Sequence, residues 1–211
     1  LYAHVFNWPD DGRLVIGGLR SGVRSVRLVA DGGRHIAGRR INENDYELQL
    51  PGDAPDKVNS LIALVLDNHV PACPVRLLNG KAPDILAAFD AELHGKGLGY
   101  GDGKPARNHV KNWKDESQWL SWNLRLNDPA RYDVYLDYNT ATASDSGTVI
   151  VKIGDRIFKT AYDGHPEKNG TRSIYVGAVS LDEGQFDCTL KGKNHTGTTY
   201  MNPIALRLQP K

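Results

Sequence analysis

The aromatic residues are the side chains of this sequence whose chemistry is most informative. Trp113 lies in a polar stretch, residues 108–114, and Tyr100 lies in a glycine-rich stretch, residues 95–104. The electron-rich face of such a ring can stack on the CH-rich face of a sugar, while Asn, Asp or Lys side chains bind the hydroxyl groups. Trp113 and Tyr100 are therefore predicted to be sugar-stacking residues at loop tips, with plain packing in a core as the alternative for each.

A third aromatic candidate follows from strand periodicity. Apolar residues occupy every second position from Leu120 to Leu126. Alternate side chains of a strand point to opposite faces, so Trp122 should point into a core. Trp119 falls on the opposite face, where it is either exposed or covered by a loop, and it is a further candidate for binding sugar.

Other chemistries find little support in the spacing of residues. The seven histidines are scattered and do not form a zinc motif. The segment before Lys104 fails as a phosphate loop, because Leu98 stands where glycine is needed and Pro105 where Ser or Thr is needed. The acidic residues sit mainly in turns, as turn chemistry explains. Calcium is harder to exclude because its oxygen ligands need no tight motif, and its candidate ligands are Glu92, Asp102 and Asn202.

Composition and charge narrow the class of protein. The formal net charge is +1, which gives no sign of a nucleic-acid partner. Hydrophobic residues make up 40% of the chain, but no apolar run approaches the roughly 18 residues that a membrane-spanning helix needs. Two cysteines, Cys73 and Cys188, are too few for a disulfide framework.

Short apolar segments separated by turn signals indicate an all-β chain. The run Leu61–Leu66 is continuously apolar and suits a strand covered on both faces. Asp84–Leu93 is assigned to a strand in preference to a helix. The other expected strands lie near residues 2–6, 13–16, 23–29, 46–50, 60–66, 120–126, 132–138, 149–153, 156–161, 173–181, 185–191 and 200–208.

Residues 70–84 contain three prolines and an Asn-Gly pair, which is typical of a domain boundary. We therefore expect two domains, 1–78 and 79–211. Each is expected to be an antiparallel β-sandwich of the Greek-key or jelly-roll kind.

The first segment carries a family resemblance. Residues 2–14, YAHVFNWPDDGRL, resemble the segment that begins the C-terminal β-sandwich of family 29 α-L-fucosidases. The likeness extends over about residues 1–67 and includes Leu50-Pro51 and the apolar run at 61–66. Because the chain opens on this strand, we expect it to begin inside a longer protein.

The second part resembles the carbohydrate-binding-module-like β-sandwiches that follow this domain in some bacterial fucosidases. These modules usually carry a Gly-x-Tyr motif. Here Ala130-Arg131 precedes Tyr132, so the usual glycine is absent. The resemblance implies that His94 and Asn202 contact sugar and that Glu92 holds a structural calcium ion. The residues that carry it are Ala91–Gly95, Trp113, Trp119–Trp122, Arg131–Leu136 and Met201–Leu206.

The catalytic residues of that family lie in an N-terminal (β/α)₈ barrel, and this sequence has no alternating strand–helix pattern. The resemblance implies a non-catalytic C-terminal region of a secreted or periplasmic bacterial α-L-fucosidase. Its expected partners are the barrel of the same parent chain and a fucosylated glycan. The alternatives are a structural or protein-interaction module that binds no sugar, and a hydrolase complete in itself.

Overall fold

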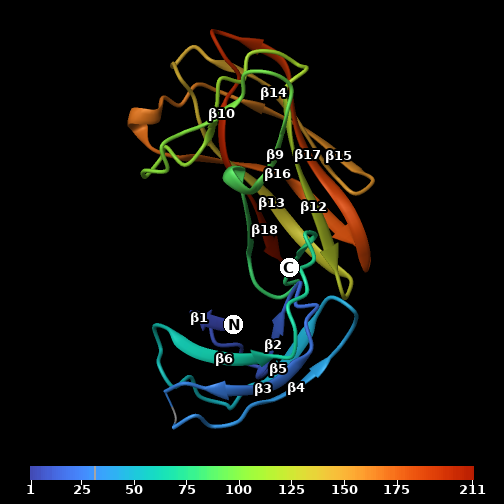
Figure 1. Cartoon of the computed structure of the whole chain (residues 1–211). Coiled ribbons are helices and arrows are strands. Elements are labelled where there is room, and N and C mark those ends of the chain that lie inside the picture. The colour runs from blue at the N-terminus through green and yellow to red at the C-terminus, as the bar shows by residue number, and fades with distance from the viewer. Residues whose placement is uncertain (31) are drawn as a thin grey trace. The chain divides into compact units, whose positions relative to one another are not determined.

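The computed structural model describes residues 1–30 and 32–211, and every element is a strand or a short 3₁₀ turn (Figure 1). Residue contacts divide the chain into two compact units, Leu1–Arg76 and Leu77–Lys211. The boundary expected from the sequence, 78/79, lies two residues further along. The all-β class predicted from the sequence is confirmed. Among the described residues, no helix is long and apolar enough to cross a membrane.

The first unit contains two three-stranded antiparallel sheets, with strand orders β1-β6-β3 and β2-β5-β4. Its core is formed by side chains from both, including Val26, Leu48 and Ile62. The segment Trp8–Gly12 turns the chain between β1 and β2, where Gly12 N–H donates to Pro9 O at 3.0 Å. The strands are β1 (Tyr2–Val5), β2 (Arg13–Ile16), β3 (Val23–Leu28), β4 (Ala37–Arg40), β5 (Tyr46–Gln49) and β6 (Ser60–Leu66).

The apolar strand β6 is covered less completely than its sequence predicts. Ile62 and Leu64 are buried in the core, but Val65 is 42% exposed. The prediction of burial on both faces is therefore wrong for this strand. Neighbouring strands flank β6 on both edges, whereas only one face of the sheet has a core against it.

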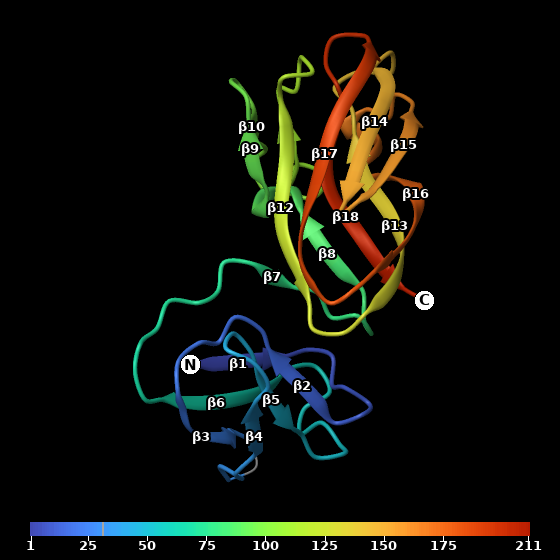
Figure 2. The ribbon, with the colours of Figure 1, turned by 90° about the vertical axis from the view of Figure 1, so that its right-hand side faces the viewer.

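The second unit is a sandwich of a six-stranded and a four-stranded sheet (Figure 2). The larger has the order β15-β14-β17-β12-β7, with β9 also paired to β12, and the smaller has the order β16-β13-β18-β8. A two-stranded sheet, β10-β11, adjoins them. The elements are β7 (Arg76–Leu77), β8 (Asp84–Ala87), η1 (Ala88–Asp90), β9 (Glu92–His94), β10 (Gly99–Tyr100), β11 (Val110–Lys111), β12 (Trp119–Leu126), β13 (Ala130–Asn139), β14 (Ser146–Ile153), β15 (Arg156–Tyr162), η2 (Glu167–Asn169), β16 (Arg172–Leu181), β17 (Gly184–Thr196) and β18 (Asn202–Pro210).

The inward positions predicted from alternation are confirmed. Leu120, Trp122, Leu124 and Leu126 of β12 are all buried, as are the alternate residues Tyr132 to Tyr138 of β13. The expected strands at 149–153 and 156–161 form a hairpin, since Ile153 pairs with Arg156 around Gly154-Asp155. Burial of these large side chains between two sheets is the main stabilising term of the unit.

The region 84–93 and the shortest strands depart from the expectations. Residues 84–93 form β8, the turn η1 and the start of β9 rather than one strand. Strands β4, β7, β10 and β11 were not predicted, and only the first two residues of β9 fell within a predicted strand. Strands β7, β9, β10 and β11 have two or three residues, too few to show alternation, and β4, with the sequence AGRR, has no apolar alternation.

Candidate functional site

Trp113, predicted to stack on sugar at a loop tip, lies in the core of the second unit. Its side chain is fully buried, and its ring lies 5.4 Å from that of Tyr200. The polar stretch around it had suggested exposure. Asn112 adopts a left-handed conformation, φ 64°, immediately before Trp113 turns inward. An enclosed ring offers no face to a ligand, so the predicted loop-tip position is wrong.

Trp119 and His94 are brought together on the outward face of the six-stranded sheet. They are direct cross-strand partners, and their rings stack with centroids 3.6 Å apart. Lys191, the partner of Trp119 on the other neighbouring strand, places its Nζ 4.6 Å from the centre of the indole ring. Strand β12 lies between β9 and β17, so His94 on β9 and Lys191 on β17 cover opposite faces of the indole. Only the edge of the ring remains for a ligand.

Glu92, the predicted calcium ligand, lies beside His94. Its carboxylate is 4.0 Å from His94 Nε2, which also contacts Ser121 Oγ at 2.8 Å. Calcium takes about six to eight oxygen ligands, which include backbone carbonyls and water, so the calcium role of Glu92 stays a prediction. No described residues form a group of three or more Asp, Glu, His or Cys side chains able to hold a metal. The three residues also fail as a nucleophilic relay, because Ser121 and Glu92 face the same imidazole nitrogen.

Tyr100 is exposed, as its predicted role requires. It is 44% exposed and meets the ring of Phe89, itself 39% exposed, edge to face at 5.2 Å. A Cβ placed on Gly103 would lie 3.7 Å from Phe89, so this aromatic pair adjoins the loop that follows β10.

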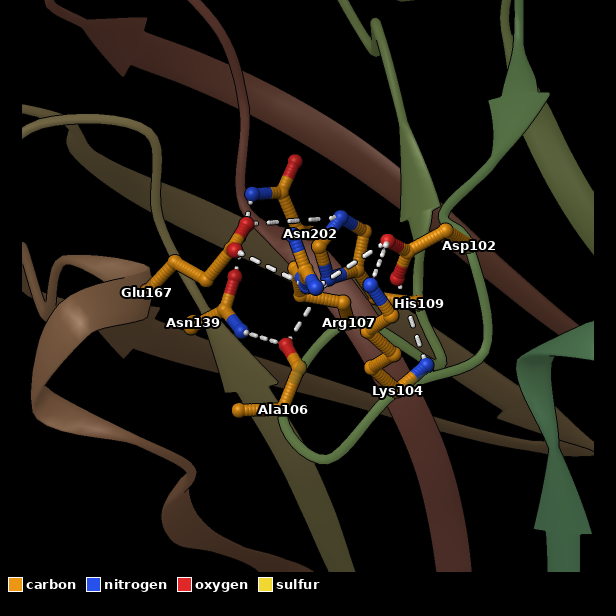
Figure 3. A network of polar contacts seen from close by, with 8 residues as sticks. All are labelled: Asp102, Lys104, Ala106, Arg107, His109, Asn139, Glu167 and Asn202. Atoms are coloured by element: carbon orange, nitrogen blue, oxygen red, sulfur yellow. Dashed lines mark hydrogen bonds and ion pairs between the residues drawn. The ribbon is translucent and has the colours of Figure 1, made fainter.

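Buried polar side chains meet at one end of the sandwich, where β13 ends and β18 begins. The last residue of β13, Asn139, pairs in register with the first residue of β18, Asn202. His109, which precedes β11, joins them, and all three side chains are buried. Figure 3 shows these three with Ala106, Arg107, Asp102, Lys104 and Glu167; we call this set of eight residues the end network.

The hydrogen bonds of the end network fix which way each amide points. The carbonyl oxygen of Ala106 can only accept, and it receives Asn139 Nδ2 at 2.6 Å and His109 Nδ1 at 3.0 Å. Asn139 Oδ1 must then be the acceptor for Asn202 Nδ2, at 3.0 Å.

One acceptor in this series of hydrogen bonds has no donor among the described residues. Asn202 Oδ1 receives no hydrogen bond from any described residue, and it is not among the described buried polar atoms that lack a partner. The atom therefore reaches solvent, and it points away from the other labelled side chains (Figure 3). It is suited to a ligand O–H or N–H.

Several hydrogen bonds hold the loop that carries Ala106. Ala106 has φ 59°, a left-handed conformation that non-glycine residues seldom adopt, and the two side chains bound to its carbonyl hold it there. Gly101 N–H donates to His109 O at 2.8 Å, and Arg107 N–H donates to Lys104 O at 2.8 Å. Strain kept in place by surrounding contacts is a common property of ligand sites.

Charged groups form the exposed rim of the end network. Arg107 lies between two carboxylates, with Nη2 3.1 Å from Asp102 Oδ2 and Nε 3.9 Å from Glu167 Oε1. His109 Nε2 lies 3.9 Å from Glu167 Oε2. About two fifths of the Arg107 and Glu167 side chains is exposed, so both can exchange water for ligand hydroxyl groups.

The turn η2 positions Glu167. Its N–H donates to Thr140 O at 3.1 Å, which ties the turn to the residue that follows Asn139. Thr140 N–H donates to the carbonyl of His165, whose Nε2 is buried without a hydrogen-bond partner among the described residues.

Gly101 provides a direct test of this loop geometry. A Cβ added there would lie 1.9 Å from the carbonyl oxygen of Arg107, so Gly101→Ala forces the loop to move. We expect it to lower the free energy of unfolding by about 1–3 kcal/mol, as measured by thermal or urea denaturation. Gly99→Ala is the matched control, since its Cβ would make only an ordinary contact, 3.7 Å from Asn112. Equal stabilities of the two variants would contradict the described loop.

Of the predicted site residues, only Asn202 and the calcium candidate Asp102 lie in the end network. Asn139 was missed because alternation from Tyr132 to Tyr138 points residue 139 outward. The register between β13 and β18 shifts at Asp137/Tyr138, and this irregularity buries Tyr138 and Asn139 together. Arg107 and His109 lie in a loop, and Glu167 lies in the turn η2. No local sequence pattern predicts that these two segments meet.

The family described as "Domain of unknown function (DUF5077)" matches residues 99–210. The chain belongs to this family. The matched region of the DUF5077 domain contains the whole end network. No curated protein matches the chain.

Solved structures share the fold at low sequence identity. An α-L-fucosidase from Vibrio sp. strain EJY3 matches over 100% of this chain and 38% of its own, with 15% identity and a TM-score of 0.56. A GH26-CBM35 β-(1,4)-mannanase from Podospora anserina matches over 62% of this chain and 28% of its own, with 18% identity and a TM-score of 0.51. The mosquito-larvicidal Cry4Aa toxin from Bacillus thuringiensis matches over 89% of this chain and 30% of its own, with 12% identity and a TM-score of 0.50.

These likenesses show the β-sandwich fold alone, because a fold does not fix a function. The chain spans between 28% and 38% of the length of these proteins.

Proposed function

We propose that the second unit is a carbohydrate-binding module and that its ligand site is the end network. The proposal rests on the fixed orientation of the Asn139 and Asn202 side-chain amides. This orientation leaves Asn202 Oδ1 as an outward acceptor. Arg107 and Glu167 add an exposed donor and an exposed acceptor beside it. A neighbouring acceptor and donor are what the vicinal hydroxyl groups of a sugar require.

Tyr100 and Phe89 supply an apolar surface next to this polar site. Their rings are exposed and adjoin the loop of the end network at Gly103. Binding sites for small ligands combine such apolar contact area with a few placed polar groups. The shared fold with a fucosidase and a CBM35-containing mannanase supports a sugar in preference to another polyol.

We further propose that the chain is an accessory region of a secreted bacterial glycoside hydrolase, an α-L-fucosidase by its sequence resemblance. The first unit supports this through its sheet β1-β6-β3. Tyr2 is 64% exposed and pairs with Ala63, two residues from the exposed Val65, so both lie on one face. Exposed apolar side chains grouped on one face suit packing against a catalytic barrel.

Binding should be measured by calorimetry with fucosyllactose, mannotriose and xylotriose. We expect at least one of them to bind, and Arg107→Ala to weaken this binding about tenfold or more through loss of a charged hydrogen-bond donor. Arg107 is partly exposed, so the variant should keep its fold, which thermal unfolding would verify. Asn123→Ala changes an exposed asparagine of β12 that is not part of the end network; it is the control and should bind normally. If none of the sugars binds, the protein-interaction alternative replaces this proposal.

A further inference from the structure

The outward face of the four-stranded sheet carries a row of side chains unrelated to the end network. Ile85 of β8 pairs with Arg207 of β18, Arg207 pairs with Tyr135 of β13, and Tyr135 pairs with Tyr175 of β16. These four residues, which we call the sheet strip, therefore cross all four strands in one line. Strands lie about 4.8 Å apart, so the strip is about 14 Å long, more than one sugar ring.

The sheet strip exposes a large apolar area. Tyr175 is 52% exposed and Ile85 is 53% exposed. The rings of Tyr135 and Tyr175 meet at 61° with centroids 5.4 Å apart, and Arg207 Cζ lies 5.2 Å from the centre of the Tyr135 ring. An aromatic edge, an aromatic face and a guanidinium plane thus follow one another across the sheet.

The side chains of the strip are held before any ligand arrives. Arg207 Nε and Nη2 bind both oxygens of Asp137, at 2.6 and 3.1 Å, and Nη2 also donates to Ser173 Oγ at 2.8 Å. This hydrogen bonding with Asp137 raises the pKa of Arg207.

The second tyrosine is fixed in a similar way. Tyr175 Oη donates to Asp133 Oδ1 at 3.1 Å, and Lys211 Nζ lies 2.8 Å from the same oxygen. The hydrogen bond from Lys211 lowers the pKa of the Asp133 carboxyl. Side chains fixed in this way lose little conformational entropy when a ligand binds.

The charges of the strip favour an uncharged ligand. Arg207 is neutralised by Asp137, and Lys211 is neutralised by Asp133. These pairs leave little field to attract a charged partner. The Arg207 and Lys211 side chains are still 35% and 40% exposed, so they can contact ligand hydroxyl groups. A ligand with apolar CH faces, hydroxyl edges and a length of more than one ring matches this surface.

We propose that the sheet strip is a second carbohydrate-binding surface, which takes an extended, uncharged polysaccharide chain. The inference rests on the proposed function only in taking the second unit to be a carbohydrate-binding module. The site itself is separate, since it shares no residue with the end network.

The test is affinity electrophoresis of the full chain in gels containing soluble mannan, xylan or xyloglucan. We expect at least one polymer to retard Arg107→Ala, in which the end network is impaired, and Tyr175→Ala added to that variant to weaken the retardation about tenfold, because a stacking contact is lost. Tyr2→Ala in the same background removes a tyrosine of the first unit that is 64% exposed, against 52% for Tyr175, and should leave the retardation unchanged.

Two outcomes would overturn the inference: equal retardation of Arg107→Ala with and without Tyr175→Ala, or no retardation of Arg107→Ala by any polymer. Failure of the end network is seen separately, because Arg107→Ala should lose the short oligosaccharides in calorimetry while the polymer still retards it. Binding of short oligosaccharides together with no effect of Tyr175→Ala would leave the proposed function standing without the second surface.

Discussion

Replacing Trp113 by alanine should lower the free energy of unfolding of the second unit by about 3–5 kcal/mol, the cost of removing a large aromatic side chain from a packed core. Trp113 is fully buried and contacts Tyr200, whose N–H donates to Trp113 O at 2.8 Å. A loss of this size should lower the melting temperature of that unit by about 10 °C or more. Calorimetric or circular-dichroism melting would measure it.

Trp113→Phe is the matched control for this prediction. Trp113 Nε1 is buried without a hydrogen-bond partner among the described residues, so phenylalanine removes an unsatisfied donor while keeping an aromatic ring. We expect it to cost less than half as much as alanine and to leave sugar binding intact. Loss of binding by Trp113→Phe at unchanged stability would instead restore Trp113 as a ligand contact.

The second large effect is expected at Asp145, a fully buried carboxylate. Its Oδ1 accepts from Thr198 N–H at 2.8 Å and from Thr199 N–H at 3.4 Å, while Oδ2 accepts from Thr142 N–H at 2.6 Å. It thus joins the loop after Asn139 to the loop before Asn202. Asp145→Ala leaves these donors unsatisfied and should cost about 3 kcal/mol, measured by urea denaturation at neutral pH.

The same carboxylate predicts a dependence of stability on pH. Burial raises the pKa of Asp145, but the hydrogen bonds from Thr198, Thr142 and Thr199 outweigh it, and the pKa is lowered overall. A carboxyl whose pKa is lower in the folded state stabilises the fold above its unfolded pKa, about 3.9. That stability is lost as the pH falls through the lower, folded value.

The pH prediction is checked with Asp145→Asn, which keeps the shape and removes the titration. Below pH 4 the wild type should lose stability more steeply than Asp145→Asn, as followed by urea midpoints at a series of pH values. Asp182→Asn, on an exposed residue, should follow the wild type. Parallel curves for the wild type and Asp145→Asn would contradict the lowered pKa.

The long strands were predictable because their sequences alternate. Tyr132 to Tyr138 and Leu120 to Leu126 show a period of two, and their inward positions are buried. The apolar run at 61–66 predicted a strand correctly, but the prediction that both of its faces are covered was wrong. Whether a second layer lies over an apolar strand depends on distant segments, which periodicity within the strand does not report.

The end network was largely unpredictable because its parts meet through irregular backbone. Ala106 is left-handed, Asn139 follows a register shift, and Glu167 stands on a single turn. Asn202 was predicted by family resemblance and not by any local pattern. Trp113 illustrates the opposite error, since polar neighbours in sequence do not exclude a partner 87 positions away, Tyr200.

The central claim, that the end network binds sugar, is tested most directly by nuclear magnetic resonance of the ¹⁵N-labelled chain. Titration with the fucosyllactose, mannotriose and xylotriose panel should shift the backbone amide signals of Arg107, Asn139 and Asn202 with one saturation curve for the sugar that binds. The same titration of Arg107→Ala should leave the Asn139 and Asn202 signals in place at matched concentrations. Saturable shifts confined to other parts of the second unit, or no shifts with any sugar, would contradict the account.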